Sequence, residues 1–332
     1  MQCGEGDHKT ERYKSCGHLY TNRMFLEKRK AGKRTKYYVV HSFRDGKKVV
    51  KLRRYIGTDL PPEKLRKARE KAESFIRAQL REYREIRNPL TQTLSDTEIE
   101  QIKKLQHKIR IYHLDERQWQ RFTQAFSYDT NAIEGSTVTR KEVTAIMEGK
   151  TPDKGSDEIA ETRNVVAAVK HIRKTENLLS LALIKKIHWI CFKDTKDFAG
   201  KFREKGVEVL IRDINGNVVH TGAPAEKIGS LLRKMVIWYN ENRHKYPPIL
   251  LAALIHNQFE DIHPFQDGNG RVGRLLLNNI LLKHDLPPVN IHFKNRTEYY
   301  KALRAFDKDG NVRPMIELIV KEYKKLQRDI RG

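Results

Sequence analysis

The chain has 332 residues, 38% of them hydrophobic and 33% charged, with a formal net charge of +24 at pH 7. This length accommodates one domain with an extension. No apolar run approaches the roughly 18 residues of a membrane-spanning helix, and the first ten residues lack the apolar core of a signal peptide. Three cysteines are too few for a disulfide framework. We therefore expect a mainly helical, cytoplasmic protein without a membrane segment, whose positive surface favours acidic partners.

The first 60 residues form a basic N-terminal region, with 16 Lys or Arg against 6 Asp or Glu. Residues 36–57 are rich in β-forming side chains on both sides of Asp45-Gly46, a dipeptide that suits a tight hairpin turn. We predict a β-hairpin there. The hairpin is either a solvated appendage, which the sequence alone favours, or a surface for nucleic acid or another anionic partner. The second interpretation uses the aromatic residues among its cations, Tyr37, Tyr38, Phe43 and Tyr55.

Residues 61–114 are predicted to form a helical connector. Pro61-Pro62 ends the strand pattern, and the charged segment that follows has the apolar stripe of a long helix. A turn at Asn88-Pro89 ends that helix. A second helix, over residues 95–114, begins with a capping pattern in which Ser95 is followed by Glu98.

The remaining residues, 115–330, are predicted to form one helical domain. Asn215-Gly216 lies between two β-branched runs, so residues 207–221 are expected to form a second hairpin, which must pack against the domain to be stable. The fold class is therefore mainly α, with an inserted β-hairpin, preceded by a small basic β-hairpin arm and a helical connector. Helical spacing of apolar residues predicts helices at 116–134, 139–148, 156–175, 180–192, 224–242, 247–262, 270–284, 295–306 and 312–329.

The sequence HPFQDGNGRVGR, residues 263–274, directly follows the predicted helix 247–262, which is apolar around most of its circumference. That helix is expected to cross the core and to deliver His263 to a loop at its end. A second apolar helix starts at once, with Gly268, Asn269 and Gly270 at its first turn. The unpaired N–H groups and the dipole of a helix start attract anions, and glycines let a phosphate approach the backbone.

Two arginines, Arg271 and Arg274, belong to the same first turn, where the helix dipole is already positive. Such a pair is unfavourable unless an anion compensates it, so the pattern indicates a polyphosphate. Asp267, the sole carboxylate of the motif, would hold Mg²⁺ together with the phosphates. A histidine titrates near neutral pH, so His263 could take a proton from an attacking hydroxyl. Each feature alone also fits a turn or a solvated surface; together they predict phosphoryl or nucleotidyl transfer.

The motif resembles the signature of the Fic family, H-x-F-x-D/E-G-N-G-R-x-x-R, at every specified position, and the resemblance extends over roughly residues 116–328. It implies a Fic-type helical domain that transfers AMP from ATP, with Mg²⁺, to a Ser, Thr or Tyr hydroxyl of a target protein. It implies His263 as the general base and Asp267 as the Mg²⁺ ligand. The implied phosphate ligands are Gly268, Asn269, Gly270 and Arg271, with Arg274 on the γ-phosphate.

The hairpin before the motif, at about residues 203–221, resembles the family's flap, which pairs with an extended segment of the target by strand addition. The flap residues implied to lie over the nucleotide are Val207, Glu208, Val209 and Leu210. Downstream, residues 295–307 resemble the segment that lines the adenine pocket, which implies that Tyr299 lies against the base. Asp307 stands where some relatives carry asparagine.

The sequence TNAIEG, residues 130–135, fits the family's inhibitory pattern of Ser or Thr, three residues, Glu, and then Gly or Asn. A helix over about residues 121–135 would aim Glu134 at Arg274 and keep the γ-phosphate of ATP out of its productive pose. Thr130 belongs to the same pattern. The alternative is an ordinary helix end with a surface glutamate; beside the complete motif, inhibition is favoured. We therefore predict an autoinhibited protein adenylyltransferase with an N-terminal inhibitory helix.

Other activities remain open. The same site could remove AMP from a modified protein, with Glu134 orienting the attacking water. The basic arm, residues 1–60, could make the chain a nucleic-acid-associated regulator, although the sequence carries no base-contacting motif. Several relatives self-associate and modify themselves, so auto-modification and a homo-oligomer are further expectations.

Overall fold

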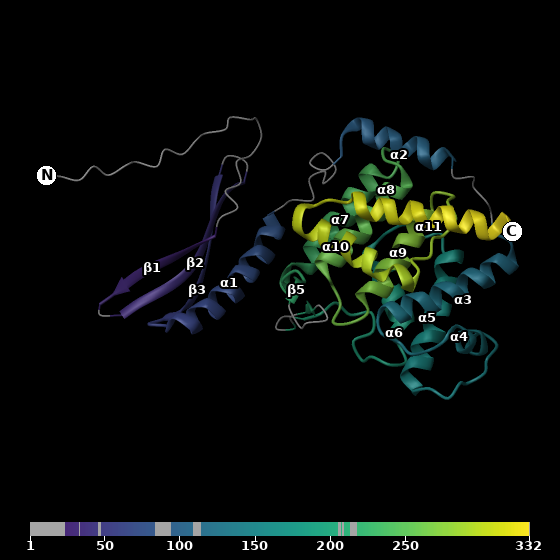
Figure 1. Cartoon of the computed structure of the whole chain (residues 1–332), viewed down its shortest axis with the longest axis horizontal. Helices are drawn as coiled ribbons and strands as arrows, with labels where there is room; N and C mark the ends of the chain where they lie inside the picture. Colours follow the sequence, from purple (N-terminus) through teal and green to yellow (C-terminus); the bar gives the residue numbers. More distant parts are fainter. Residues whose placement is uncertain are drawn as a thin grey trace. The chain divides into compact units, whose positions relative to one another are not determined.

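The computed structural model describes residues 24–32, 34–45, 48–83, 94–108, 114–204, 207, 209–212 and 218–331. They belong to two compact units, Met1–Gln79 and Leu80–Gly332 (Figure 1). Several residues of the sequence predictions lie outside the described residues: Gly46, Asn88-Pro89, Glu208 and Asn215-Gly216.

The N-terminal unit contains an antiparallel sheet in the order β1-β2-β3. The predicted hairpin is the β2–β3 pair, in which Asp45 lies opposite Lys48. The sheet has a third strand, β1, which the sequence did not indicate; it pairs with the other edge of β2, where Phe25 lies opposite Val40. Four of the seven residues of β1 are charged, so its hydrophobic pattern gives no strand signal. The strands are β1 (Phe25–Ala31), β2 (Arg34–Asp45) and β3 (Lys48–Thr58).

Helix α1 (Pro62–Tyr83) follows the sheet and packs on one of its faces. The guanidinium carbon of Arg54 lies 3.5 Å from the centre of the Phe75 ring of this helix. Successive side chains of a strand point to opposite faces, so Arg54 and its cross-strand partner Val39 lie on the helix side, and Tyr38 lies on the other face. Val39 of β2 and both Ala72 and Ile76 of α1 are buried.

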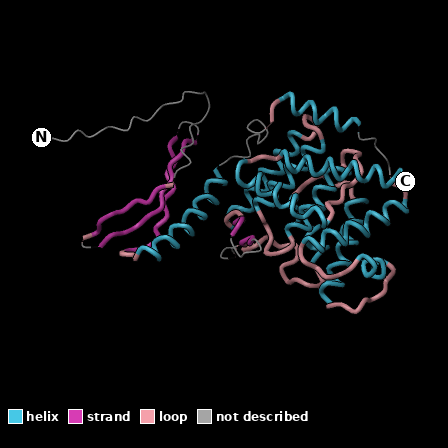
Figure 2. Tube along the Cα trace, viewed as in Figure 1, coloured by secondary structure: helices cyan, strands magenta, loops and turns pink. Residues whose placement is uncertain are grey.

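The C-terminal unit is mainly helical and carries one short β-hairpin (Figure 2). The nine helices predicted after residue 115 correspond in order to α3 through α11, with ends that differ by a few residues. Within the described ranges, no helix is both long and apolar enough to cross a membrane. The elements are α2 (Asp96–Lys108), α3 (Glu116–Ile133), α4 (Arg140–Met147), α5 (Ser156–Lys174), α6 (Leu181–Phe192), β4 (Leu210–Arg212), β5 (Val218–Thr221), η1 (Ala225–Lys227), α7 (Ile228–Asn242), α8 (Pro248–Ile262), α9 (Asn269–Leu282), η2 (Phe293–Asn295), α10 (Arg296–Asp309) and α11 (Arg313–Arg331).

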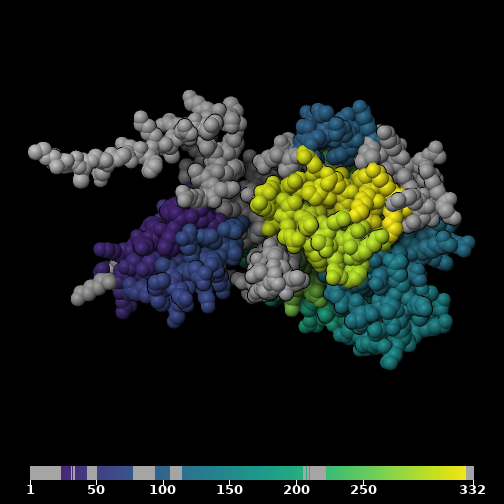
Figure 3. Space-filling view, viewed as in Figure 1, coloured from purple at the N-terminus to yellow at the C-terminus, as the bar shows by residue number. Residues whose placement is uncertain are grey.

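Helices α8 and α9 form the centre of this unit. Residues 249–255 of α8 are each at most 1% exposed, as expected for a helix that is apolar on all sides. Helix α9 packs along α8 and also contacts α3, α5 and α6, while α7, α10 and α11 contact α8. Figure 3 shows α10 and α11, in yellow-green and yellow, covering one face of the unit. The six residues between α8 and α9 are therefore held between two buried helices.

Candidate functional site

A cavity lies where the α8–α9 connection meets the C-terminal end of α3, the flap and α10. Its wall includes eight of the residues predicted from the sequence: Glu134, Val209, His263, Asp267, Gly268, Asn269, Gly270 and Tyr299. It also includes residues that were not predicted, among them Glu260 at the end of α8 and Tyr300, Leu303 and Arg304 on α10. The other described residues predicted for the site do not line the cavity: Thr130, Val207, Arg271 and Arg274.

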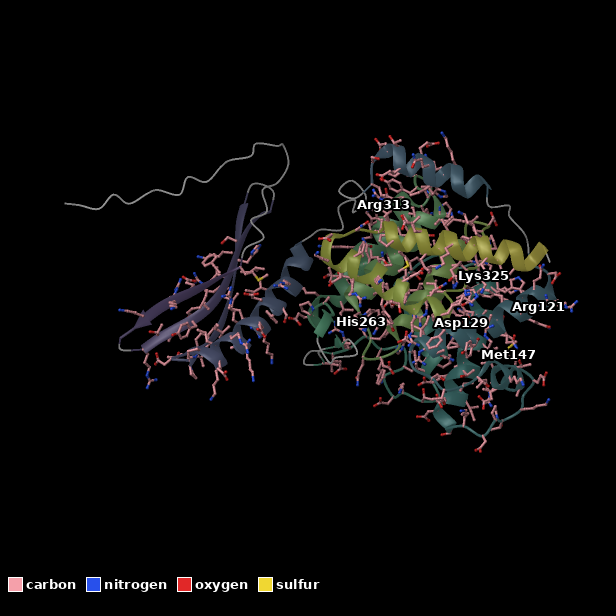
Figure 4. The ribbon with its side chains drawn as sticks, in the orientation of Figure 1. Arg121, Asp129, Met147, His263, Arg313 and Lys325 are labelled. Atoms are coloured by element: carbon pink, nitrogen blue, oxygen red, sulfur yellow. The ribbon has the colours of Figure 1, made fainter. Side chains whose placement is uncertain are left out.

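His263, labelled in Figure 4, caps α8. Its backbone is left-handed, with φ 51° and ψ 62°, which is unusual for a residue with a side chain. Its N–H donates to the carbonyl of Phe259 at 2.9 Å. Its Nδ1 lies 3.2 Å from the carbonyl oxygen of Glu260. A neutral imidazole that donates from Nδ1 to this carbonyl carries its lone pair on Nε2, and this tautomer is the one that can accept a proton there.

Glu260 is a buried acid beside this histidine, and sequence reasoning missed it. Its Oε2 lies 3.9 Å from His263 Nδ1, and its Oε1 is buried without a hydrogen-bond partner among the described residues. Burial raises the pKa of the Glu260 carboxyl to about 8. The carboxyl is therefore mostly protonated at neutral pH. An acidic residue within the otherwise apolar helix of residues 247–262 was the available sequence signal.

The α8–α9 turn has a backbone that only glycine fits at its centre. Gly268 has φ 79° and ψ 10°, and a Cβ there would lie 2.2 Å from the Phe192 ring. The amide side chain of Asn269 accepts the N–H of Phe265 and donates to the carbonyl of Phe265, both at 2.9 Å. The side chain of Asn269 therefore fixes the turn. The backbone of Asn269 lies at the start of α9, where the sequence predicts a contact with an anion.

The motif loop rests on His188 of α6, another residue that the sequence did not indicate. The His188 ring stacks on Phe265 with centroids 3.7 Å apart, and its Nε2 lies 3.1 Å from the Asp267 carbonyl. Its Nδ1 accepts the N–H of Gly200 at 2.7 Å, so Nε2 is the donor nitrogen. Burial lowers the pKa of His188 to about 4, which keeps the ring neutral. Phe265 is fully buried.

Arg271 is paired with carboxylates on both sides. Its Nη1 forms an ion pair with Glu161 of α5, and its Nη2 lies 3.9 Å from Asp267 Oδ2. Asp267 Oδ2 is also 3.6 Å from Lys196 Nζ, while Asp267 Oδ1 accepts the N–H of Gly268 at 2.6 Å. The Asp267 side chain is 49% exposed at the cavity, whereas Arg271 is 7% exposed. Two cations and one accessible carboxylate therefore lie next to the start of α9.

Among the described residues, no group of three or more His, Cys, Asp or Glu side chains could enclose a metal ion. Asp267 alone has a carboxylate that is both exposed and part of the motif. Mg²⁺ commonly takes one or two carboxylates and completes its shell with water and substrate phosphates. Asp267 fits that mode of binding and is the residue that would hold the ion.

Arg274 is buried and contacts Glu134 at the end of α3. This is the pairing that the sequence pattern predicted. The Nη2 atom lies 2.7 Å from Glu134 Oε1 and 3.0 Å from the Thr130 carbonyl, and Nε donates to Thr130 Oγ1 at 2.8 Å. A Cβ on Gly270 would lie 2.2 Å from Glu134 Oε1. The Glu134 carboxylate therefore lies against the first turn of α9, where the motif predicts a phosphate.

Tyr299 supports Arg274 from the opposite side. Its hydroxyl lies 3.2 Å from Arg274 Nη1 and 3.0 Å from His256 Nε2, and its side chain is 1% exposed. Burial lowers the pKa of His256 to about 3, so this ring is neutral. The contact between Tyr299 and adenine stays a prediction. Its neighbour Tyr300 also lines the cavity, and the Tyr300 hydroxyl donates to the Ile133 carbonyl at 3.3 Å.

The predicted second hairpin is present as β4 and β5, although its strands are shorter than the range 207–221 suggested. Leu210 lies opposite Thr221, and the register is irregular before Arg212, which lies opposite Val218. The N–H of Gly222 donates to the Val209 carbonyl at 3.2 Å. Val209 lines the cavity and Val207 precedes it; the side chain of Leu210 lies outside the described residues.

The C-terminal unit contains a match to a known protein family. Residues 178–281 match the family model described as Fic/DOC family. A curated relative, protein adenylyltransferase Fic of Nematostella vectensis, is 32% identical over 209 residues, which are 58% of this chain and 45% of the relative. Protein adenylyltransferase fic-1 of Caenorhabditis briggsae is 33% identical over 204 residues, 59% of this chain and 39% of the relative. The chain thus spans less than half the length of these relatives.

Solved structures of Fic proteins have the same fold as this chain. Fic-1 from C. elegans superimposes with a TM-score of 0.59 at 25% identity, covering 82% of this chain and 78% of that one. A Fic family protein from Desulfovibrio desulfuricans G20 gives a TM-score of 0.63 at 25% identity, covering 72% of this chain and 75% of that one.

Proposed function

The chain belongs to the Fic/DOC family through residues 178–281, and from this premise we propose that it is a protein adenylyltransferase. It would transfer AMP from ATP to a hydroxyl side chain of a target protein. The observation that carries the proposal is the position of His263 on the wall of a cavity that also contains the first turn of α9 and the carboxylate of Asp267. These groups provide a base, an anion site and a metal ligand around one space.

In the proposed reaction, the phosphates of ATP lie at the start of α9, near Arg271 and Arg274. Asp267 would hold Mg²⁺, which when bound would neutralise phosphate charge. The hydroxyl oxygen of the target attacks the α-phosphorus, the bond from this phosphorus to the oxygen bridging to the β-phosphorus breaks, and pyrophosphate leaves. Nε2 of His263 takes the hydroxyl proton.

We further propose that Glu134 inhibits this reaction in the free chain. Its carboxylate is 2.7 Å from Arg274 Nη2, and it lies against Gly270. A γ-phosphate that uses the same guanidinium must displace this carboxylate, and the two negative groups repel each other. ATP would then bind either weakly or in a pose that does not present its α-phosphorus to His263.

Incorporation of AMP from labelled ATP tests both the proposed transfer and the proposed inhibition by Glu134. Glu134→Gly should strongly increase AMP incorporation, and adding His263→Ala should abolish it. Glu148→Gly is a matched control, because Glu148 caps α4 and precedes Gly149 as Glu134 caps α3 and precedes Gly135, yet its partner is the exposed Lys150. If labelling is the same in the Glu134 and His263 variants as in the unaltered chain, the assignment is wrong.

Removal of AMP from a modified protein is the second reaction that this site supports, because Glu134 reaches the cavity and could orient a water molecule. It is tested by incubating a target, adenylylated by the Glu134→Gly chain, with the unaltered protein. Release of AMP by the unaltered protein, lost in Glu134→Gly, would establish removal. Mass spectrometry of the Glu134→Gly reaction in a lysate would identify the target, the modified residue and any auto-modification.

The N-terminal sheet supports a second candidate function, binding of nucleic acid. On its face away from α1, Arg29 and Arg53 lie 5.6 and 5.9 Å from the Tyr38 ring centre, and Tyr55 is 5.4 Å from it and 52% exposed. Cations beside exposed aromatic rings suit phosphates and bases. The 332-residue chain should bind single-stranded DNA with an affinity that falls steeply with salt, and Arg53→Glu should weaken this binding.

The control for this experiment is Lys64→Glu, which makes the same charge change at an exposed site on α1. Equal losses in both variants would mean that net charge alone attracts DNA, and no binding at low salt would exclude the function.

A further inference from the structure

One arginine connects the flap to the loop that carries His263. Arg203 lies at the start of the flap, before β4, and is 7% exposed. Its Nε donates to the His263 carbonyl at 2.8 Å, and its Nη1 donates to the Val207 carbonyl at 3.0 Å. Its Nη2 donates to the Ala223 carbonyl and lies 3.4 Å from the Ile262 carbonyl. A single guanidinium therefore contacts the residues before β4, those after β5, and the end of α8.

Backbone contacts make this junction tight. The N–H of Arg203 donates to the Pro264 carbonyl at 3.0 Å, and the N–H of Ala223 donates to the Ile262 carbonyl at 3.1 Å. A Cβ on Gly222 would lie 2.8 Å from Arg203 Nη2 and 3.0 Å from the Cβ of His263. There is no space for a side chain at Gly222, so the end of the flap approaches the histidine backbone directly.

The end of α8 needs such a partner. The last carbonyls of a helix have no intrahelical donor, and a helix usually ends in the left-handed conformation at glycine or asparagine. Here the left-handed residue is His263, with φ 51°, a conformation that is strained in a residue with a side chain. Arg203 donates to the carbonyls of both Ile262 and His263 and so stabilises this conformation. An arginine fork reaches several acceptors at once, which a lysine ammonium cannot do with the same geometry.

We propose that Arg203 is a positioning residue for AMP transfer, which sets the distance between the flap and the His263 imidazole. This inference rests on the proposed function, in which the target lies along the flap and gives its hydroxyl proton to His263. Because one guanidinium holds both elements, a displacement of the flap and a rotation of the His263 backbone are coupled. The hydroxyl of the bound target then reaches the His263 imidazole only when the flap and the end of α8 both keep their hydrogen bonds to Arg203.

The kinetic test introduces Arg203→Lys into the Glu134→Gly chain, the parent, and compares the double variant with this parent. Misplacement of reacting groups by about 1 Å lowers rates about 100-fold, so kcat/KM for the target should fall by about this factor. The hydrogen bonds described for the Arg203 guanidinium go to the flap and to the end of α8. ATP binds at the start of α9 in the proposed function, so KM for ATP should stay within about twofold. Arg233→Lys, an exposed arginine on α7, should match the parent in both constants.

Hydrogen exchange tests the same inference without any AMP transfer. In Arg203→Lys, two amides should exchange faster: that of residue 203, which donates to Pro264, and that of Ala223, which donates to Ile262 at the end of α8. Amides of residues 249–255, in the core of α8, should exchange as in the parent. If the parent transfers no AMP, the proposed function is wrong. Hydrogen exchange would still test whether Arg203 holds the flap to the end of α8.

Two outcomes would overturn the inference. One is unchanged exchange at Ala223 together with unchanged target kinetics in Arg203→Lys. The other is faster exchange throughout α8 with an equal loss of affinity for ATP, which would make Arg203 a general structural residue.

Discussion

Replacing Glu260 by glutamine should stabilise the C-terminal unit at pH 8 and have much less effect at pH 5. Glutamine keeps the shape of the side chain and removes its ionisation. The carboxyl has a pKa of about 8 in the folded chain, raised from 4.5 by burial. Between these values the unfolded chain ionises Glu260 while the folded chain keeps it protonated. Ionisation therefore favours the unfolded state increasingly as the pH rises through this window.

The size of the effect follows from the shift. Each pKa unit corresponds to about 1.36 kcal/mol, so the full window lowers the free energy of unfolding by about 5 kcal/mol. Most of this change falls between pH 5 and pH 8, where the unaltered chain should lose about 3–4 kcal/mol relative to Glu260→Gln. The buried histidines His188 and His256 are present in both chains, so their own titration cancels in the difference.

Urea unfolding followed by tryptophan fluorescence gives this difference directly. All three tryptophans, Trp119, Trp189 and Trp238, lie in the C-terminal unit, so the signal reports on that unit alone. Glu317→Gln, at an exposed site on α11, is the control and should run parallel to the unaltered chain. Parallel curves for Glu260→Gln and the unaltered chain from pH 5 to pH 8 would refute the assignment of a protonated Glu260.

Three other changes probe the site. Thr130→Val removes the oxygen that accepts from Arg274 Nε; AMP incorporation should rise about 5- to 10-fold as the inhibitory contact weakens, and an unchanged rate would argue against Thr130 as part of that contact. Gly268→Ala places a Cβ 2.2 Å from the Phe192 ring at a positive φ and should cost at least about 2 kcal/mol in urea unfolding. His188→Phe keeps an aromatic ring but loses the hydrogen bond to the motif loop; kcat should fall about 10-fold, with the urea midpoint monitored to detect unfolding.

The sequence was sufficient where the determining residues are close together along the chain. The helices from α3 to α11 were predicted because their apolar residues recur with helical spacing. The position of the motif at the turn between two helices was predicted because its twelve residues are contiguous. The pairing of Glu134 with Arg274, 140 residues apart, was predicted only through the resemblance to a family pattern. No spacing rule relates two such distant positions.

The residues that the sequence missed are those whose role depends on a distant partner. Arg203 and His188 look like ordinary members of a charged loop and an amphipathic helix, and only the folded chain places them against the carbonyls of residues 262–267. Glu161 likewise resembles many surface glutamates until α5 brings it to Arg271. Strand β1 was missed for a different reason, because its charged composition hides the alternation that a strand usually shows.

Both arginines of the motif are paired with carboxylates, yet the two pairs differ in how readily they can separate. Glu161 lies within α5 and is 16% exposed, so its release would require movement of a packed helix. Glu134 caps the end of α3 and is 31% exposed. It is followed by Gly135, which has φ 95° and where an added Cβ would meet no atom of the described residues within 4 Å. The backbone after Glu134 therefore has space to move, while Arg271 keeps its partner. In the proposed function, a nucleotide that enters the cavity would therefore displace Glu134 without disturbing the remainder of the site, and the proposed inhibition would be reversible by local motion alone.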